Sequence, residues 1–202
     1  TLIYHRELDD AWVQEATRVE KILKIKVVGR SRGQKLVVSD DWVTEILVVE
    51  GRSLTYKQPE QAFIQPNGVV NQEMLGWACA HAQNSNQDLL ELYCGIGNFT
   101  IPLSKHYRRV LATEVSKVAT RAAQENLVLN EVDNVAFARL AAEEVTQAMN
   151  GEREFRRLKS LDPRLSDYDL ATVFVDPPRA GLDDGTARLC QKFNQILYVS
   201  CN

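Results

Sequence analysis

The stretch of sequence that decides the fold is Asp88-Leu89-Leu90-Glu91-Leu92-Tyr93-Cys94-Gly95-Ile96-Gly97-Asn98-Phe99-Thr100. An apolar run leads into a small, flexible turn and then a helical pattern, which is typical of a buried parallel strand followed by a glycine loop and a helix. Gly95 and Gly97 can adopt positive φ and let a ligand approach the backbone. Glu91 is expected near the carboxyl end of the strand, where open α/β sheets bind ligands. The stretch therefore predicts a nucleotide-type cofactor site.

Composition places the chain among ordinary globular proteins. It has 202 residues, of which 45% are hydrophobic and 25% charged, enough for a sizeable core. The net charge of −3 gives no basic signature, so bulk charge alone does not favour a nucleic-acid partner. Neither a long apolar run nor a signal-peptide pattern is present, so no membrane partner is expected. Because the chain begins at Thr1 and stops just after an apolar run, we expect it to be a piece of a longer polypeptide.

The four cysteines are widely spread and form no CxxC pair. This pattern favours reduced thiols in a cytoplasm over a disulfide framework or a zinc site, and no bound metal is expected. A buried, small apolar residue is the default expectation for each cysteine. At most one of them is expected to be chemically special; the four are Cys79, Cys94, Cys190 and Cys201.

Residues 1–60 are predicted to form a small, β-rich α+β subdomain. A helix to Leu23 is expected behind the acidic pair Asp9-Asp10, and short strands follow at 25–28, 35–38, 44–49 and 53–56. A basic cluster lies within this region. It could contact a phosphate backbone, or be a charged, solvated hairpin edge, and the low net charge favours the second interpretation. The members of the cluster are Lys24, Lys26, Arg30, Arg32 and Lys35.

Residues 61–202 are predicted to form a second domain of the α/β class, with a parallel, doubly wound sheet and helices on both faces. A helix over 71–82, capped by Asn71, is expected to precede the sheet. The run 151–169 is polar, and we expect an irregular loop there. The expected strands are 89–94, 109–113, 134–138, 171–175 and 195–200, and the expected helices are 98–107, 117–130, 142–149 and 184–193.

The glycine turn and the strand after it narrow the choice of cofactor. A dinucleotide fingerprint requires a third glycine, and Thr100 stands in its place, which lowers the odds of NAD or FAD. Glu114 ends the next strand, where its carboxylate can accept the ribose hydroxyls of a nucleoside; alternatively, it only neighbours the cap of the following helix. S-adenosylmethionine has no pyrophosphate, and strand–GxG–helix followed by strand–Glu is the general arrangement of methyltransferases that use it.

Two further motifs are expected at the carboxyl edge of the same sheet. Asp176 begins a rigid Asp-Pro-Pro loop that suits positioning a planar base, or that forms only a sharp strand exit. Cys201 follows the last strand, and Arg179 could favour its thiolate. Taken alone, a cysteine at a strand end is far more often a packing residue than a nucleophile.

Together these motifs resemble those of the RNA uracil-5 methyltransferases, and within that family the tRNA branch that modifies the T-loop uridine. The resemblance runs through essentially the whole chain. The family motifs are Leu90–Phe99, Val175–Arg179 with Gly181-Leu182-Asp183, and Ser200-Cys201-Asn202; those of the tRNA branch are Phe63–Asn67 and Ala141–Gly151.

The resemblance implies a Rossmann-like class I methyltransferase sheet with S-adenosyl-L-methionine as cofactor. It also implies the T-arm of tRNA as partner, with other RNA as a second possibility. Cys201 matches the nucleophile, whose thiolate adds to C6 of uracil so that C5 can accept the methyl group. The family's glutamate base has no counterpart in the chain, so we expect this fragment to be inactive alone. The resemblance implies five cofactor-binding residues, and the two glycines of the turn complete the predicted set. The seven residues are Gln65, Tyr93, Gly95, Gly97, Asn98, Glu114 and Asp176.

Three alternatives remain open on the sequence. The ribosomal-RNA branch has a similar sheet but usually adds an iron–sulfur cysteine cluster, which this chain lacks. A non-catalytic RNA-binding module on a methyltransferase fold would not need a nucleophile. A dehydrogenase is weakly supported by the glycine turn alone.

Overall fold

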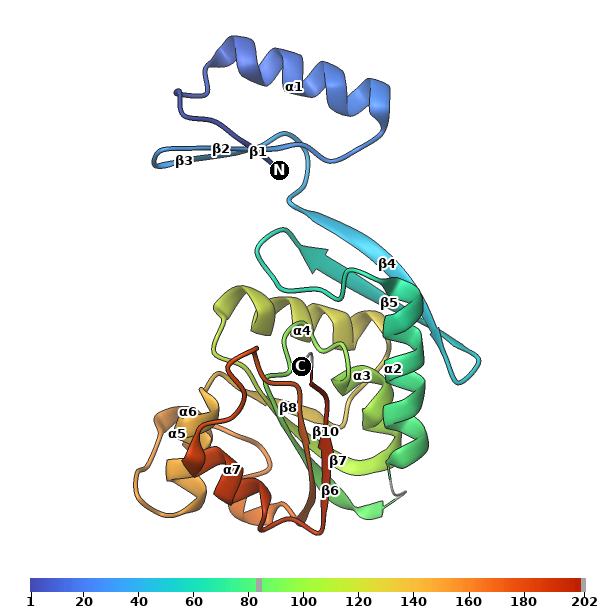
Figure 1. The fold of residues 1–202 in the computed structure, drawn as a ribbon, viewed down its shortest axis with the longest axis vertical. Coiled ribbons are helices and arrows are strands. Elements are labelled where there is room, and N and C mark those ends of the chain that lie inside the picture. The colour runs from blue at the N-terminus through green and yellow to red at the C-terminus, as the bar shows by residue number, and fades with distance from the viewer. Residues whose placement is uncertain (83–84, 201–202) are drawn as a thin grey trace.

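The computed structural model describes residues 1–82 and 85–200 (Figure 1). At the N-terminus, β1 (Leu2–Ile3), β2 (Val28–Ser31) and β3 (Gln34–Val37) form a sheet in that order, next to helix α1 (Asp10–Leu23). The predicted acidic cap is confirmed, because the Asp9 side chain accepts a hydrogen bond from the Trp12 amide. Gly29 lets β2 pass under this helix, since a Cβ there would lie only 2.4 Å from the Trp12 ring.

A hairpin of β4 (Trp42–Val49) and β5 (Arg52–Pro59) connects this small sheet to the rest of the chain. Its inner side chains belong to the same core cluster as the main sheet, among them Leu47, Leu54 and Tyr56. The domain boundary near residue 60 stays a prediction. The packing of the hairpin supports an earlier boundary, between β3 and β4.

The main sheet has five parallel strands in the order β10-β9-β6-β7-β8, which confirms the predicted doubly wound α/β fold. The order reverses beside β6, because the chain runs from β6 outward to β7 and β8 and then returns to β9 and β10. Ligands of open α/β sheets bind at such a reversal. The strands are β6 (Ser85–Leu92), β7 (Tyr107–Thr113), β8 (Val135–Ala138), β9 (Leu170–Val175) and β10 (Gln195–Tyr198).

Two apolar cores cover the two faces of this sheet, since successive strand residues point to opposite sides. Leu89 and Phe174 face a core that includes α2 (Gly68–His81), α3 (Thr100–Leu103) and α4 (Lys117–Leu129). Leu90 and Val173 face the opposite core. That second core includes α5 (Ala142–Met149), α6 (Arg156–Lys159) and α7 (Asp184–Cys190).

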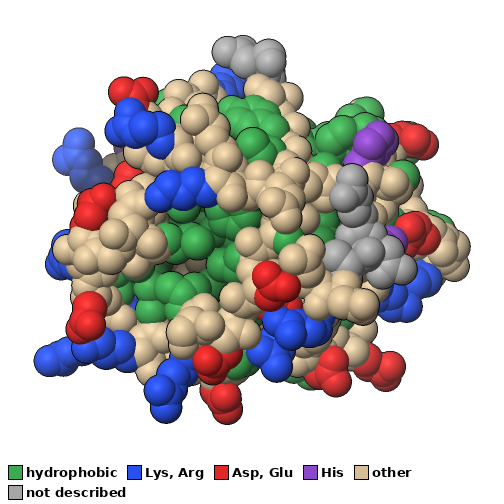
Figure 2. All heavy atoms as spheres, turned by 90° about the horizontal axis from the view of Figure 1, so that it is seen from below, with side chains coloured by type: hydrophobic (Ala, Val, Ile, Leu, Met, Phe, Trp, Pro, Cys, Tyr) green, Lys and Arg blue, Asp and Glu red, His purple; other side chains and the backbone are tan. Residues whose placement is uncertain are grey.

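The lower face of the molecule holds the amino ends of the strands (Figure 1). It shows hydrophobic side chains in a hollow, with basic and acidic side chains interspersed around it (Figure 2). A buried Asp88 ties three strands together there. Its carboxylate accepts two hydrogen bonds from the Arg108 guanidinium and one from the Asp169 amide. Within residues 1–82 and 85–200, no helix is long and apolar enough to cross a membrane.

Several predicted element bounds were wrong. Helix α2 begins earlier than predicted, because Asn67 caps it by accepting a hydrogen bond from Val70, while Asn71 lies buried inside it. The predicted helix over 98–107 is only α3 followed by the 3-10 turn η1 (Ser104–His106), since Tyr107 already pairs with β6. The strand predicted to reach Cys94 ends at Leu92.

The first strand of the small sheet after α1 is also displaced, since β2 spans Val28–Ser31 where the sequence predicts 25–28, and further departures lie in the C-terminal half. The run 151–169 is not wholly irregular, because it contains α6 and the 3-10 turn η2 (Leu165–Asp167). The last helix and the last strand are shorter than predicted, α7 ending at Cys190 and β10 at Tyr198. Helices α4 and α5 lie where the sequence places them, to within one residue.

Candidate functional site

A cavity of about 660 Å³ opens at the carboxyl ends of β6, β7 and β9. Segments far apart in the sequence form its walls: the glycine turn, the ends of two other strands and the joint around Pro66. Apolar side chains such as Ile64 and Phe99 supply part of the surface. Six of the seven residues predicted to bind the cofactor line this cavity: Gln65, Tyr93, Gly95, Asn98, Glu114 and Asp176.

Gly97, the seventh, is not among the residues that line the cavity. It has a φ of +84°, and a Cβ there would lie 3.6 Å from the Cβ of Ala123 on α4. That distance is ordinary van der Waals contact, so the positive φ, and not a close approach to α4, is what favours glycine at position 97. Tyr93 also has positive φ, at 62°, a conformation that costs a non-glycine residue on the order of 1 kcal/mol.

A reciprocal amide pair joins the glycine turn to α2. The Asn71 amide nitrogen donates to the Asn98 side-chain oxygen at 3.0 Å, and the Asn98 amide nitrogen donates to the Asn71 oxygen at 2.8 Å. Asn71 is only 2% exposed, and the Tyr56 hydroxyl donates to the Asn98 carbonyl at 3.0 Å. From the sequence, Asn71 is predicted only as a helix cap, although a polar residue within an apolar helix is a signal for such a partner.

Asn126, which no sequence motif singles out, is a second anchor of the turn. From inside α4, its side chain donates to the Ile96 carbonyl at 3.0 Å and to the Lys57 carbonyl at 3.2 Å, and it accepts from the Lys57 amide at 2.7 Å. Strand β5, helix α4 and the glycine turn therefore meet at one fully buried amide. No sequence pattern pointed to it, because its partners are backbone atoms of distant segments.

Backbone amides fix the orientation of Glu114. One carboxylate oxygen accepts from the Gly95 amide at 3.1 Å, and the other accepts from the Ser116 amide at 2.7 Å. Ser116, and not Glu114, caps α4. The half-buried Glu114 side chain thus bridges the glycine turn and the next strand while it lines the cavity.

A buried carboxyl group, Glu91 on β6, and a half-buried one, Asp176 just after β9, lie near the turn. Burial raises the pKa of Asp176 from 3.8 to about 6. The pKa of Glu91 is raised from 4.5 to about 8, mainly by burial. The nearby Thr100 hydroxyl acts to lower this pKa, and the charge of Asp176 acts to raise it. Glu91 is only 1% exposed, and its Oε2 has no hydrogen-bond partner among the described residues. At neutral pH, a protonated Glu91 therefore accompanies a mostly ionised Asp176.

The three described cysteines are free, buried thiols. Burial raises the pKa of Cys79 to about 12, raises that of Cys94 well above its usual value, and raises that of Cys190. None of the three is poised as a thiolate at neutral pH. The predicted nucleophile, Cys201, lies outside the described residues. Arg179, proposed to favour its thiolate, lines the cavity.

The basic cluster near the N-terminus is largely neutralised by ion pairs. The Arg30 guanidinium hydrogen-bonds to Glu60 and holds the pKa of that carboxyl at about 2. This supports the interpretation as a solvated, charged edge; contact with phosphates stays a prediction. The ion pairs are Lys26–Asp40 at 2.6 Å, Arg30–Glu60 at 2.8 Å, Lys35–Asp41 at 2.6 Å and Lys35–Glu60 at 3.6 Å.

The arrangement of the sheet and the cavity is that of a class I methyltransferase. The fold is similar to that of a solved structure, the tRNA (uracil-54, C5)-methyltransferase of Pyrococcus abyssi in complex with S-adenosyl-L-homocysteine. The TM-score is 0.59 at 21% identity, over 88% of this chain and 41% of the other. At this identity the similarity establishes the fold alone.

The sequence comparisons define the family. The profile described as tRNA (Uracil-5-)-methyltransferase matches residues 1–202, so the chain belongs to that family. It is 57% identical to the tRNA/tmRNA (uracil-C(5))-methyltransferase of Acinetobacter baylyi and 53% identical to the enzyme of that name from Neisseria meningitidis serogroup B. Each match covers all of this chain but only 56% of the relative, so the chain spans little more than half the length of these relatives.

Replacing Asn71 tests whether the amide pair positions the turn. Asn71→Ala leaves the Asn98 side chain without its buried partner, which should cost about 1–3 kcal/mol. We expect the free energy of unfolding to fall by that amount and S-adenosylmethionine to bind about tenfold more weakly, measured by denaturant unfolding and calorimetry. Asn150→Ala, at an exposed helix end, is the control. Unchanged affinity and stability in Asn71→Ala would contradict the assignment.

The pKa of Glu91 predicts a pH-dependent stability. The pKa of Glu91 is higher in the folded protein than its ordinary 4.5. Its favourable contribution to the free energy of unfolding is therefore complete below about pH 4.5 and is lost as the pH rises to about 8. Glu91→Gln removes the ionisable proton with little change of shape. We expect the variant to exceed the wild type in free energy of unfolding by an amount that grows with pH, to about 4 kcal/mol near pH 8. Glu73→Gln, on the exterior of α2, should show no such trend.

Proposed function

We propose that the protein of which this chain forms part is an S-adenosylmethionine-dependent enzyme that methylates C5 of a uridine in the T-loop of tRNA. One observation carries this proposal. In a chain that belongs to the tRNA (uracil-5-)-methyltransferase family, the six predicted contacts converge on one cavity at the strand-order reversal. The names of the relatives, which include tRNA and tmRNA, support an RNA substrate, and we expect the enzyme to act in the cytoplasm.

The donors and acceptors of the cavity suit S-adenosylmethionine. Glu114, held by two backbone amides, offers its carboxylate to the ribose hydroxyls, and apolar side chains such as Ile64 and Phe99 flank the space for a purine. Asn98 and Tyr93 are assigned to further contacts on the glycine turn, and Gln65 to one from the joint. The cofactor supplies an electrophilic methyl group when bound.

Cys201 is proposed to activate the uridine. C5 of uracil is a weak nucleophile, and addition of the thiolate to C6 forms a C–S bond and moves an electron pair toward C5. After the methyl group has joined C5, a base removes the C5 proton, and the C–S bond breaks to release the thiolate. The target base must leave its stack to reach the thiol, which costs a few kcal/mol and less in a loop than in a duplex.

The raised pKa of Asp176 gives a test of the cofactor site. If the Asp176 carboxylate accepts a hydrogen bond from the cofactor, affinity should be highest when it is ionised and fall as the pH drops through about 6. Calorimetry from pH 5 to pH 8 should show this step for S-adenosylmethionine. Asp176→Asn should bind more weakly and without the step, whereas the exposed Asp133→Asn should behave as the wild type.

The same titrations with NAD separate the methyltransferase from the dehydrogenase interpretation. Binding of NAD in preference to S-adenosylmethionine would contradict the proposed cofactor.

Replacement of Cys201 tests the proposed chemistry. In the full-length protein, Cys201→Ala should abolish methylation of a T-arm RNA and should form no covalent complex with 5-fluorouridine RNA, because the thiol that attacks C6 is absent. The wild type should form that complex, since a fluorine at C5 cannot leave as a proton does. Methylation is measured by transfer of a labelled methyl group.

Cys190→Ala, a change in a buried cysteine of α7, is the matched control and should still methylate. Unchanged turnover by Cys201→Ala would contradict the nucleophile assignment and favour a different mechanism. Preference for a ribosomal-RNA fragment over the T-arm would place the enzyme in the other branch.

A further inference from the structure

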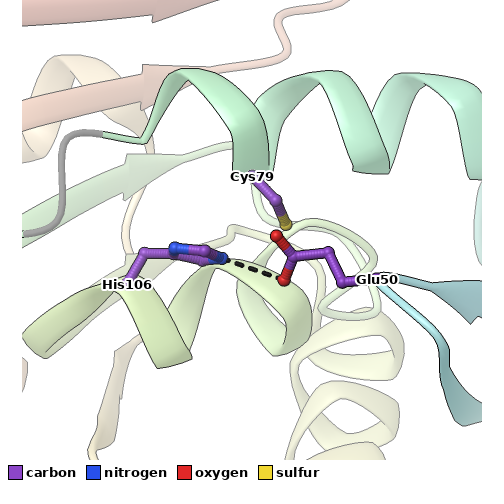
Figure 3. Close-up of side chains that lie close together, drawn as sticks. All are labelled: Glu50, Cys79 and His106. Atoms are coloured by element: carbon purple, nitrogen blue, oxygen red, sulfur yellow. Dashed lines mark hydrogen bonds and ion pairs between the residues drawn. The ribbon is translucent and has the colours of Figure 1, made fainter.

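Three potential metal ligands converge away from the cofactor cavity, between the β4–β5 hairpin, α2 and η1 (Figure 3). They are Glu50 in the hairpin turn, Cys79 in α2 and His106 in η1. Their ligand atoms, a carboxylate oxygen, a thiol sulfur and a ring nitrogen, all lie within 4.8 Å of one another. Glu50 and Cys79 are 29 positions apart in the chain, and Cys79 and His106 are 27 positions apart, yet the three side chains meet at one point.

The side chains are aimed at one another. The His106 Nε2 lies 3.1 Å from a Glu50 carboxylate oxygen, and the Cys79 sulfur points toward the same carboxylate (Figure 3). Cys79 is 2% exposed, whereas the Glu50 and His106 side chains are 42% and 21% exposed. The group is therefore open to solvent on one side and closed by α2 on the other.

The simplest alternative is a surface contact between Glu50 and His106 beside a buried thiol. The turn argues for more than that. Glu50 and Gly51 form a two-residue hairpin loop with φ values of 51° and 74°, and the first position of such a loop favours Asn, Asp or Gly. A glutamate in this left-handed conformation lowers the stability of the fold. An exposed ion pair contributes too little to stability to offset that loss.

The ligand set matches one class of ion. Zn²⁺ binds thiolate sulfur, imidazole nitrogen and carboxylate oxygen in a tetrahedron, and a site with three protein ligands keeps a fourth position for water. Zinc–ligand bonds of about 2.0–2.3 Å place the ligand atoms about 3.5 Å apart, so the cluster needs only small side-chain rotations to close. Binding of the ion displaces the proton of the Cys79 thiol to solvent, and the bound thiolate and the Glu50 carboxylate then carry two negative charges, which a divalent cation balances.

We propose that Glu50, Cys79 and His106 form a binding site for a thiophilic divalent cation of the Zn²⁺ class. The ion fastens the β4–β5 hairpin to α2 and η1. Because α2 also carries Asn71, two turns toward its N-terminus, the site secures the helix against which the glycine turn is held. The proposal rests on these three residues and is independent of the proposed methyl transfer.

The test is titration of the metal-free, full-length protein with Zn²⁺ by calorimetry and with Co²⁺ by absorption spectroscopy. We expect one ion to bind with a micromolar or lower dissociation constant, a thiolate-to-Co²⁺ charge-transfer band, and a higher melting temperature with Zn²⁺. Cys79→Ala should lose the band. Glu50→Gln and His106→Ala, which change more exposed side chains, should weaken Zn²⁺ binding by about tenfold or more.

Matched controls keep the outcome clear. Cys190→Ala removes another buried thiol and His5→Ala an exposed histidine, and both should bind Zn²⁺ as the wild type does. If the wild type shows no stoichiometric binding, the proposal is wrong. It is also wrong if folded Glu50→Gln and His106→Ala variants retain full affinity and the same rise in melting temperature.

Discussion

The amide pair of buried Asn71 and half-buried Asn98 holds the glycine turn against α2, and the rest of the cavity depends on it. Each amide uses its donor and its acceptor on the other, so neither is left unsatisfied in the interior. Asn126 on α4 also donates a hydrogen bond to the Ile96 carbonyl, so the turn is held from two sides. That support lets Tyr93 remain in a left-handed conformation, and it presents the Gly95 amide to Glu114.

Burial gives the carboxyl groups of the site different properties. Glu91 and Asp176 end neighbouring strands, and both lose solvent, but Glu91 is the more deeply enclosed and has the higher pKa. Two ionised carboxylates close together would repel each other in this low-dielectric setting. Protonation of Glu91 relieves that repulsion and leaves the charge on Asp176, which faces the cavity.

The β4–β5 hairpin connects the small N-terminal sheet to the methyltransferase sheet. Its Tyr56 hydroxyl and Lys57 backbone hold the glycine turn and α4, and its Leu47 and Leu54 complete the core over one face of the sheet. The opposite end of the hairpin carries Glu50, beside Cys79 and His106. One two-stranded element thus contacts both the cofactor cavity and the proposed cation site.

The sequence alone determined the parallel α/β sheet, the glycine turn and the family resemblance, because these depend on short-range patterns: apolar runs, helical spacing and motifs of adjacent residues. It also predicted that the glycine turn, Glu114 and Asp176 lie together, since the carboxyl ends of parallel strands meet at one edge, whereas Gln65, Tyr93 and Asn98 were implied by the family resemblance. Only the tertiary structure revealed the partners of Asn71 and Asn126, the pKa of Glu91, and the meeting of Glu50, Cys79 and His106. These features arise from contacts between distant segments and from burial. Neither can be predicted from the spacing of neighbouring residues in the sequence.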